Sequence, residues 1–351
     1  MTTVSHAFSG HGRVAAATRD RVLRIADDLG YTANVHAQRL VWGRSRTLAI
    51  QIAGFTTASS KSLLLPDAAY FMDVLNGAAS AAAEQQYALM LTPHALDPNQ
   101  IHPLAIDGGV IVDPAGDEAL ATVLSKREKP IVTTGRPTRG SAFPWVDNDH
   151  GQITRRMLTH MLAMGHARPA LIATTPTRSY VADIVEAYEA WTREHDLPQI
   201  IVELREPPTE RAAARAASRL LTRSDRPDAV YATYDRLALG VLSEARRLRI
   251  SVPDELGIAS AVDSDALRWA DPHITAAGLN ARRIGREAVR LLIDLLEGRE
   301  PVSRRVVVPS RVIPRSSTRR ARAEETRAIA GARDERASAA NGGGRRPGAR
   351  T

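Results

Sequence analysis

The sequence predicts an α/β fold made of two similar lobes. Three observations predict it: strand-like and helix-like segments alternate from residue 47 to residue 318, their connections are short, and the alternation runs through two comparable sets. Ligands of such open sheets bind beyond the carboxyl ends of the strands, so two facing lobes predict a cleft for a small molecule.

One short amphipathic helix is predicted before the lobes. Val22, Ile25, Ala26 and Leu29 fall at i, i+3, i+4 and i+7, which makes one apolar stripe, and Gly30 ends the helix. A helix of this length is marginal in water, so we expect it to need a packing partner.

The two sets of segments are predicted in detail. For the first set we expect strands at 47–53, 87–92, 109–112 and 130–134, with helices at 67–86 and 117–126. For the second set we expect strands at 170–174, 200–203, 228–232 and 256–259, with helices at 150–164, 179–195, 209–221 and 235–248. A further helix at 280–298 and a segment at 306–313 follow.

Composition limits the function classes. The chain of 351 residues has no Cys, which excludes disulfides, thiolate catalysis and Cys-based zinc sites. It has no apolar run of 18 residues and no basic-then-apolar signal segment at its start, so we expect no membrane partner and a cytoplasmic protein.

The basic charge lies at the two ends. Residues 1–46 hold seven Arg and three Asp, residues 319–351 hold nine Arg and four acids, and the body between them is near neutral. Charge placed in this way suits contact with phosphates at the ends, or simply keeps the ends soluble. Residues 319–351 have one large aliphatic residue, Ile329, so we expect a disordered tail rich in Arg, Ala and Gly.

Several N-terminal motifs point to one family. They are, in order, 3–10 (TVSHAFSG), Arg13-Val14, 18–22 (TRDRV), 29–31 (LGY) and 34–40 (NVHAQRL). Together they resemble the DNA-binding headpiece of the lactose-repressor (LacI-type) transcriptional regulators. Further segments that resemble this family are Asp147-Asn148 with Gly151, His160-Met161-Leu162 with Gly165-His166, 228–242 and 252–275, so the resemblance covers about residues 2–318.

The resemblance implies a domain organisation. It implies a truncated helix-turn-helix headpiece with a hinge helix at 1–46, because the family's first helix would precede Met1. It also implies a periplasmic-binding-protein-like core at 47–318 that forms a homodimer and couples effector binding to DNA affinity. We assign about 47–146 and 277–300 to lobe 1, and about 147–276 and 301–318 to lobe 2.

The resemblance implies a DNA-binding set in the headpiece. Major-groove contacts would come from Thr2, Thr3 and His6, and phosphate contacts from Arg19 and Arg39. In the hinge segment, Asn34 would cap the helix and Leu40 would insert into the minor groove as an apolar wedge, unless Leu40 is an ordinary linker residue. Operator DNA is therefore the expected macromolecular partner.

The resemblance also implies a set of effector-binding residues. Tyr70 and Phe71 would stack on a flat ring or a sugar face, or else belong to the core. Arg178 would bind a carboxylate, phosphate or carbonyl edge, or else lie at the surface, and Tyr180 follows it in the same segment. Asp235 would accept hydrogen bonds from ligand hydroxyls or cap the following helix. Asp263 is the second of two acids that the family usually has.

Two positions depart from the family pattern. Ile184 replaces a frequent Arg, and Val262 replaces the first of the paired acids. These replacements remove charged contacts worth about 1.5 to 3 kcal/mol each, which argues against the common type of sugar inducer.

The predicted function is a ligand-responsive DNA-binding transcriptional regulator of the repressor type. We expect no enzyme, cofactor or metal site, because the sequence has no G-x-G-x-x-G after the first strand, G-x-x-x-x-G-K-[ST], G-x-S-x-G or H-E-x-x-H motif. The alternative is a cytoplasmic small-molecule sensor that has lost DNA binding.

Overall fold

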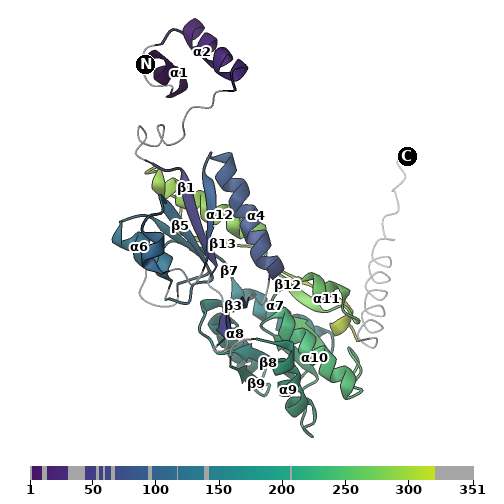
Figure 1. Ribbon diagram of the computed structural model, residues 1–351. Helices are drawn as coiled ribbons and strands as arrows, with labels where there is room; N and C mark the ends of the chain where they lie inside the picture. The colour runs from purple at the N-terminus through teal and green to yellow at the C-terminus, as the bar shows by residue number, and fades with distance from the viewer. Residues whose placement is uncertain are drawn as a thin grey trace, which may run out of the picture.

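The computed structural model describes residues 2–9, 14–30, 44–52, 55–57, 60–64, 68–93, 97–116, 118–137, 142–205 and 208–320. These residues form two helices at the N-terminus and two α/β lobes (Figure 1). Every helix and strand predicted at 47–298 is present, with ends within two residues of the prediction. The predicted tail from 321 onward lies outside the described residues.

The N-terminal helices α1 (Thr2–Ser9) and α2 (Ala16–Asp28) pack against each other, with Ala7 and Ala26 buried. The predicted apolar stripe on α2 is only partly covered, since the side chains of Ile25 and Leu29 are 47% and 76% exposed. The predicted hinge segment 34–40 lies outside the described residues.

The first lobe contains a parallel six-stranded sheet in the order β13-β7-β6-β5-β1-β4. Its strands are β1 (Thr47–Ile52), β4 (Ala88–Thr92), β5 (Gly108–Val112), β6 (Ile131–Thr134), β7 (Trp145–Asn148) and β13 (Arg305–Val308). All six residues of β1 are buried, as expected for a central strand that is covered on both faces. The hairpin β2 (Phe55–Thr57) and β3 (Ser60–Leu64) pairs separately.

Helices cover both faces of this first sheet. One face packs on α4 (Ala68–Glu84) and α12 (Ala281–Leu296), and the other on α5 (Pro98–Ile101) and α6 (Ala119–Lys126). Two glycines allow α4 and α12 to approach closely. A Cβ at Gly285 would lie 1.9 Å from the carbonyl oxygen of Val74, and one at Gly77 would lie 1.9 Å from that of Arg282.

The second lobe has a six-stranded sheet in the order β14-β12-β11-β10-β8-β9, in which only β14 is antiparallel to its neighbour. Its strands are β8 (Pro169–Thr174), β9 (Ile201–Leu204), β10 (Ala229–Ala232), β11 (Gly257–Ser260), β12 (Thr275–Gly278) and β14 (Arg311–Ile313). Its helices are α7 (His150–Ala163), α8 (Ser179–Glu194), α9 (Glu210–Leu221), α10 (Asp235–Arg247), α11 (Asp265–Trp269) and the 3-10 turn η1 (Ser316–Thr318).

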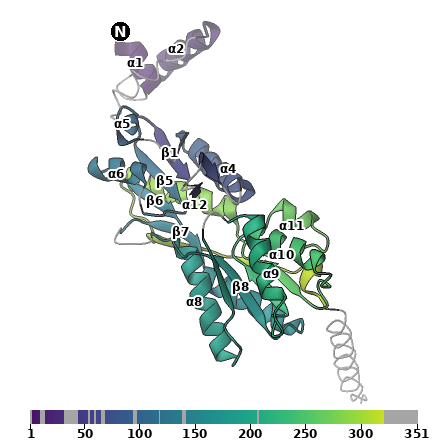
Figure 2. The same cartoon turned by 60° about the horizontal axis from the view of Figure 1, so that its bottom comes forward.

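The chain passes between the two lobes three times, and Figures 1 and 2 show the lobes as separate bodies. The crossings lie between β7 and α7, between β12 and α12, and between β13 and β14. The assignment of 301–318 to lobe 2 was therefore wrong for β13, which pairs with β7 in the first sheet. The lobe limits at 147 and 277 also cut through β7 and β12. One apolar run, 306–313, supplies both sheets because Pro309 and Ser310 separate two short strands.

In the part of the chain that the structure describes, no helix is long and apolar enough to span a membrane. Within these residues there is also no group of three or more His, Asp or Glu side chains that could hold a metal ion.

Candidate functional site

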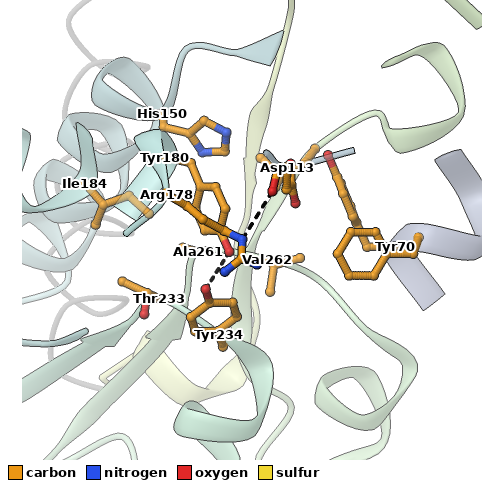
Figure 3. Close-up of a pocket in the computed structure, with 12 residues that line it drawn as sticks. Tyr70, Asp113, His150, Arg178, Tyr180, Ile184, Thr233, Tyr234, Ala261 and Val262 are labelled. Carbon is orange, nitrogen blue, oxygen red and sulfur yellow. Dashed lines mark hydrogen bonds between the residues drawn. The ribbon is translucent and has the colours of Figure 1, made fainter. Parts of the chain in front are cut away.

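A small cavity lies between the lobes, at the carboxyl ends of β5, β7, β10, β11 and β12 (Figure 3). The first lobe contributes Tyr70, Phe71 and Asp113 to its wall. The second lobe contributes His150, Arg178, Tyr180, Ile184, Thr233, Tyr234, Ala261, Val262 and Leu279. Because both lobes line the cavity, any molecule bound in it contacts both.

Aromatic side chains form two sides of the cavity. Tyr70 and Phe71 lie at the start of α4, with ring centroids 5.6 Å apart in an edge-to-face arrangement. On the opposite side, the hydroxyl groups of Tyr180 and Tyr234 are hydrogen-bonded at 2.5 Å. These side chains offer both ring faces and phenolic hydrogen-bonding groups to a ligand.

Arg178 crosses from one lobe to the other. It occupies the N-cap position of α8, only 4% of its surface is exposed, and its Nε donates to the backbone carbonyl of Asp113 at 3.3 Å. Asp113 follows β5 with a backbone φ of 50°. Burial raises the pKa of the Asp113 carboxyl to about 7, although the nearby Arg178 opposes the rise.

His150 lies beside this pair at the start of α7. Its Nε2 is 3.1 Å from Oδ1 of Asp147, and the side chain is almost completely buried. Burial alone would lower the pKa of His150, but the carboxylates of Asp147, Asp113 and Asp183 outweigh burial and raise it. Asp113 and His150, whose pKa values are both raised, line the same cavity.

The structure brings together four of the six predicted effector residues, namely Tyr70, Phe71, Arg178 and Tyr180. Asp235 and Asp263 do not line the cavity. Asp235 is buried at the start of α10, where its Oδ1 accepts from the backbone N–H of Arg236 at 2.6 Å. Asp263 forms ion pairs with Arg268 and Arg315 at 3.0 and 2.8 Å, so its carboxylate is already paired within the second lobe.

Sequence reasoning missed Asp113, His150, Thr233, Tyr234 and Leu279 as candidate residues. A usable signal existed, because each of them follows a strand of one of the two sheets by one or two residues. The two departures from the family pattern, Ile184 and Val262, do line the cavity and present apolar groups there.

The predicted DNA-binding residues are only partly described. Thr2 begins α1, Thr3 is exposed on it, and His6 is half-buried. Arg19 lies half-buried on α2, and its Nε has no hydrogen-bond partner among the described residues. Asn34, Arg39 and Leu40 lie outside the described residues, so their roles stay predictions.

Comparisons with known proteins agree with this architecture. Residues 158–318 match the family described as "Periplasmic binding protein-like domain". The chain is 28% identical to the HTH-type transcriptional regulator YkvZ of Bacillus subtilis, with 90% of this chain and 95% of the relative covered. It is 27% identical to the HTH-type transcriptional repressor CytR of Escherichia coli, with 90% and 92% covered.

A solved complex of the transcriptional regulator CelR with cellobiose has the same fold. Its TM-score is 0.69 at 24% identity, with 90% of this chain and 95% of that chain covered. These relatives are named as transcriptional regulators and not as enzymes. The two-lobed fold, the cavity between the lobes and the similarity along nine tenths of the chain lead to one conclusion: the chain has a periplasmic-binding-protein-like core and is similar to HTH-type transcriptional regulators, as the resemblance to the LacI family implies.

Proposed function

We propose that this regulator is a homodimeric, cytoplasmic repressor whose operator affinity changes when a small molecule binds between its lobes. One observation carries the proposal: the cavity wall comes from both lobes, and Arg178 already joins them by its hydrogen bond to Asp113. A ligand held by both lobes favours one arrangement of the lobes over others, and its binding energy can shift that equilibrium.

The path from the cavity to DNA runs through the first lobe. A second link between the lobes, the ion pair of Arg136 with Asp183, lies near the cavity and responds to the same relative movement. The first strand of the lobe, β1, begins at Thr47, directly after the headpiece and hinge segment. A shift of the first lobe therefore moves the hinge segment. This movement changes whether the hinge forms a helix on DNA.

The homodimer is supported by exposed apolar side chains. Met72 on α4 and Trp269 at the end of α11 are 55% and 83% exposed. Met72 lines a second hollow together with Asp73 of α4 and with Arg268 of α11, the residue before Trp269. Large exposed apolar side chains fit an interface with a second copy.

Duplex selection tests the proposal. The chain is incubated with a library of random DNA duplexes at several salt concentrations, and the bound duplexes are sequenced with and without cellobiose, adenosine and myo-inositol. A recovered operator, bound much more tightly than bulk DNA and changed in affinity by one of these compounds, supports the repressor. Binding of a compound without preference for any duplex supports the ligand sensor instead.

The predicted wedge supplies a matched variant for this test. Leu40→Ala is expected to weaken operator binding and bending, because an apolar side chain inserted between base steps is lost. Effector affinity should stay nearly unchanged. If Leu40→Ala binds the selected operator as tightly as the original chain, the wedge assignment is wrong.

A further inference from the structure

Strand β9 lies at the free edge of the second sheet. Among the strands that the structure describes, it pairs only with β8. The carbonyl oxygens of Ile200 and Leu204 accept from N–H groups of β8 at 2.8 and 3.1 Å. Because alternate residues of a strand direct their backbone groups to opposite sides, Ile201 and Glu203 turn their N–H and C=O groups to the free edge. Such an edge can pair with one more strand from another chain.

A groove follows this edge, between β9 and helix α9. Val202 and Leu204 of β9 contribute apolar groups to its lining, and Ala212, Ala216 and Leu220 of α9 contribute the others. Figure 1 shows β9 and α9 at the opposite end of the molecule from the N-terminal helices α1 and α2. The groove is therefore separate both from the cavity between the lobes and from the helices that resemble a DNA-binding headpiece.

The groove is bordered by basic side chains, namely Arg205, Arg215, Arg219 and Arg223. Arg223 is already paired, since its Nε and one terminal nitrogen donate to the carboxylate of Asp225 at 2.8 and 2.9 Å. The other three are exposed and form no ion pair within the described part of the chain. Three guanidinium groups along one groove favour an acidic occupant.

The one acid in the lining does not offset this charge. Glu203 stands between Val202 and Leu204 on β9, so its side chain lies on the opposite face of the sheet from theirs. There its carboxylate accepts from the hydroxyl of Thr175 at 2.8 Å. The charge of the groove on the α9 side therefore stays positive.

The spacing of the basic groups matches an extended chain. Arg215 and Arg219 are four residues apart on α9, which is a rise of about 6 Å along a helix. Side chains on one face of an extended chain recur every second residue, which is about 6.8 Å. A segment with an acid at every second position therefore places consecutive carboxylates beside consecutive guanidinium groups.

We propose that the second lobe docks an acidic, extended segment of a partner protein, which adds a strand to β9 and places alternate carboxylates beside Arg215 and Arg219. A peptide fits this edge because its backbone supplies both donors and acceptors for Ile201 and Glu203, whereas a phosphodiester chain supplies acceptors only. The proposal is independent of the proposed function, since it involves neither the cavity nor the operator.

Binding of labelled octapeptides to the full chain, measured by fluorescence anisotropy, tests the class of partner. The probe alternates Glu and Thr, which gives an extended chain with all its carboxylates on one face. One control alternates Lys and Thr, and the other is the Glu-Thr peptide with every backbone amide methylated. The probe is expected to bind at least about tenfold more tightly than either control, because the first is repelled by the Arg side chains and the second has no backbone donors.

Charge reversal locates the bound peptide. Arg215→Glu and Arg219→Glu change exposed side chains and should each weaken binding of the Glu-Thr peptide by at least about fivefold. Arg211→Glu is the matched control, because Arg211 is exposed on the same helix but does not line the groove. If Arg215→Glu and Arg219→Glu both bind the peptide like the original chain, the peptide binds elsewhere and the proposal is wrong.

Two substitutions at one position test the added strand. Glu203→Pro removes the N–H at the free edge, where it makes no bond to β8, and Glu203→Ala keeps this N–H. Peptide binding should be lost in Glu203→Pro and kept in Glu203→Ala. If Glu203→Pro does not fold, as judged by circular dichroism, the methylated peptide decides the result. Undiminished binding in Glu203→Pro, or of the methylated peptide, would mean that charge alone holds the peptide, and strand addition is then excluded.

A DNA duplex of random sequence, titrated against the same variants, tests the other class of partner. Duplex binding that Arg215→Glu abolishes, without binding of the Glu-Thr peptide, would assign the groove to nucleic acid and overturn the proposal. If neither probe binds the groove, the proposal is also wrong, and the Arg side chains only keep this edge from pairing with other strands. None of these titrations contains effector or operator, so the repressor proposal stands or fails separately.

Discussion

The Nε of Arg178, in the second lobe, lies 3.3 Å from the backbone carbonyl oxygen of Asp113, in the first lobe, and donates a hydrogen bond to it. This bond spans the cavity, so it contributes both to the wall and to the relative position of the lobes. Removal of this hydrogen bond should therefore change the affinity for a ligand in the cavity.

Arg178→Ala is expected to lower effector affinity by about 10- to 100-fold, because hydrogen bonds to a charged group contribute about 1.5 to 3 kcal/mol. The measurement is a calorimetric titration with whichever of cellobiose, adenosine and myo-inositol raises the melting temperature of the original chain most. Arg193→Ala removes an exposed Arg from the last turn of the same helix and should leave affinity unchanged. Equal affinity in both variants would remove Arg178 from the binding set.

Gly285→Ala is expected to destabilise the first lobe by about 1 to 3 kcal/mol, since its Cβ would lie 1.9 Å from the carbonyl oxygen of Val74 and must push α12 away from α4. Urea unfolding measures the change. Gly151→Ala is the control, because the nearest atom to its Cβ, Oδ1 of Asp149, lies at an ordinary 3.5 Å. A neutral effect at both positions would contradict the close approach of α4 and α12.

Asp113→Asn is expected to change how stability depends on pH. The native carboxyl keeps its proton up to about pH 7, whereas the ordinary pKa is 3.8, so the folded protein binds more protons between these values. The contribution of this carboxyl to the free energy of unfolding is therefore fully present below about pH 3.8. It is lost progressively as the pH rises to the folded-state pKa of about 7. Asn does not titrate, so the variant lacks this loss.

Unfolding free energies measured at about pH 5.5 and about pH 8 test this expectation. The original chain should lose at most about 2 kcal/mol more than Asp113→Asn between the two conditions. Asp254→Asn, at an exposed position, should behave like the original chain. An Asp113→Asn profile parallel to that of the original chain would mean that the carboxyl titrates at its ordinary pKa.

Ser317→Ala is expected to destabilise the second lobe by about 1 to 3 kcal/mol, because two backbone groups lose a buried partner. The hydroxyl of Ser317 donates to the carbonyl of Ile258 at 2.6 Å and accepts from the N–H of Thr275 at 2.9 Å. The neighbouring Ser316 is exposed, so Ser316→Ala serves as the control in the same denaturation series. Equal midpoints for the two variants would show that the 3-10 turn does not stabilise the lobe.

The parts of the fold that sequence could predict are those with strong local patterns. The buried strand β1 and the helices α8 and α10 follow directly from apolar periodicity and were predicted to within one residue. The hairpin β2–β3 and the short β12 carry no such pattern. The division of 306–313 between two sheets depends on tertiary pairing, which periodicity does not encode.

The site shows the same limit. Tyr70, Phe71, Arg178 and Tyr180 were found through resemblance to a family, whereas Asp113 and His150 come together only when two sheets face each other. Asp263 was misplaced because its two Arg partners lie 5 and 52 residues further along the chain. Sequence alone does not reveal that its carboxylate is already paired.

The three crossings between the lobes determine how this protein can be divided for experiments. Neither lobe is one continuous stretch of chain: the first needs α12 and β13, which come after most of the second. A fragment that stops after β7 would expose the apolar face against which α12 packs, and a fragment that begins at α7 would carry α12 without α4. Nested deletions would therefore report misfolding rather than the location of a function. A single proteolytic cut at one crossing would leave both halves tied by the other two.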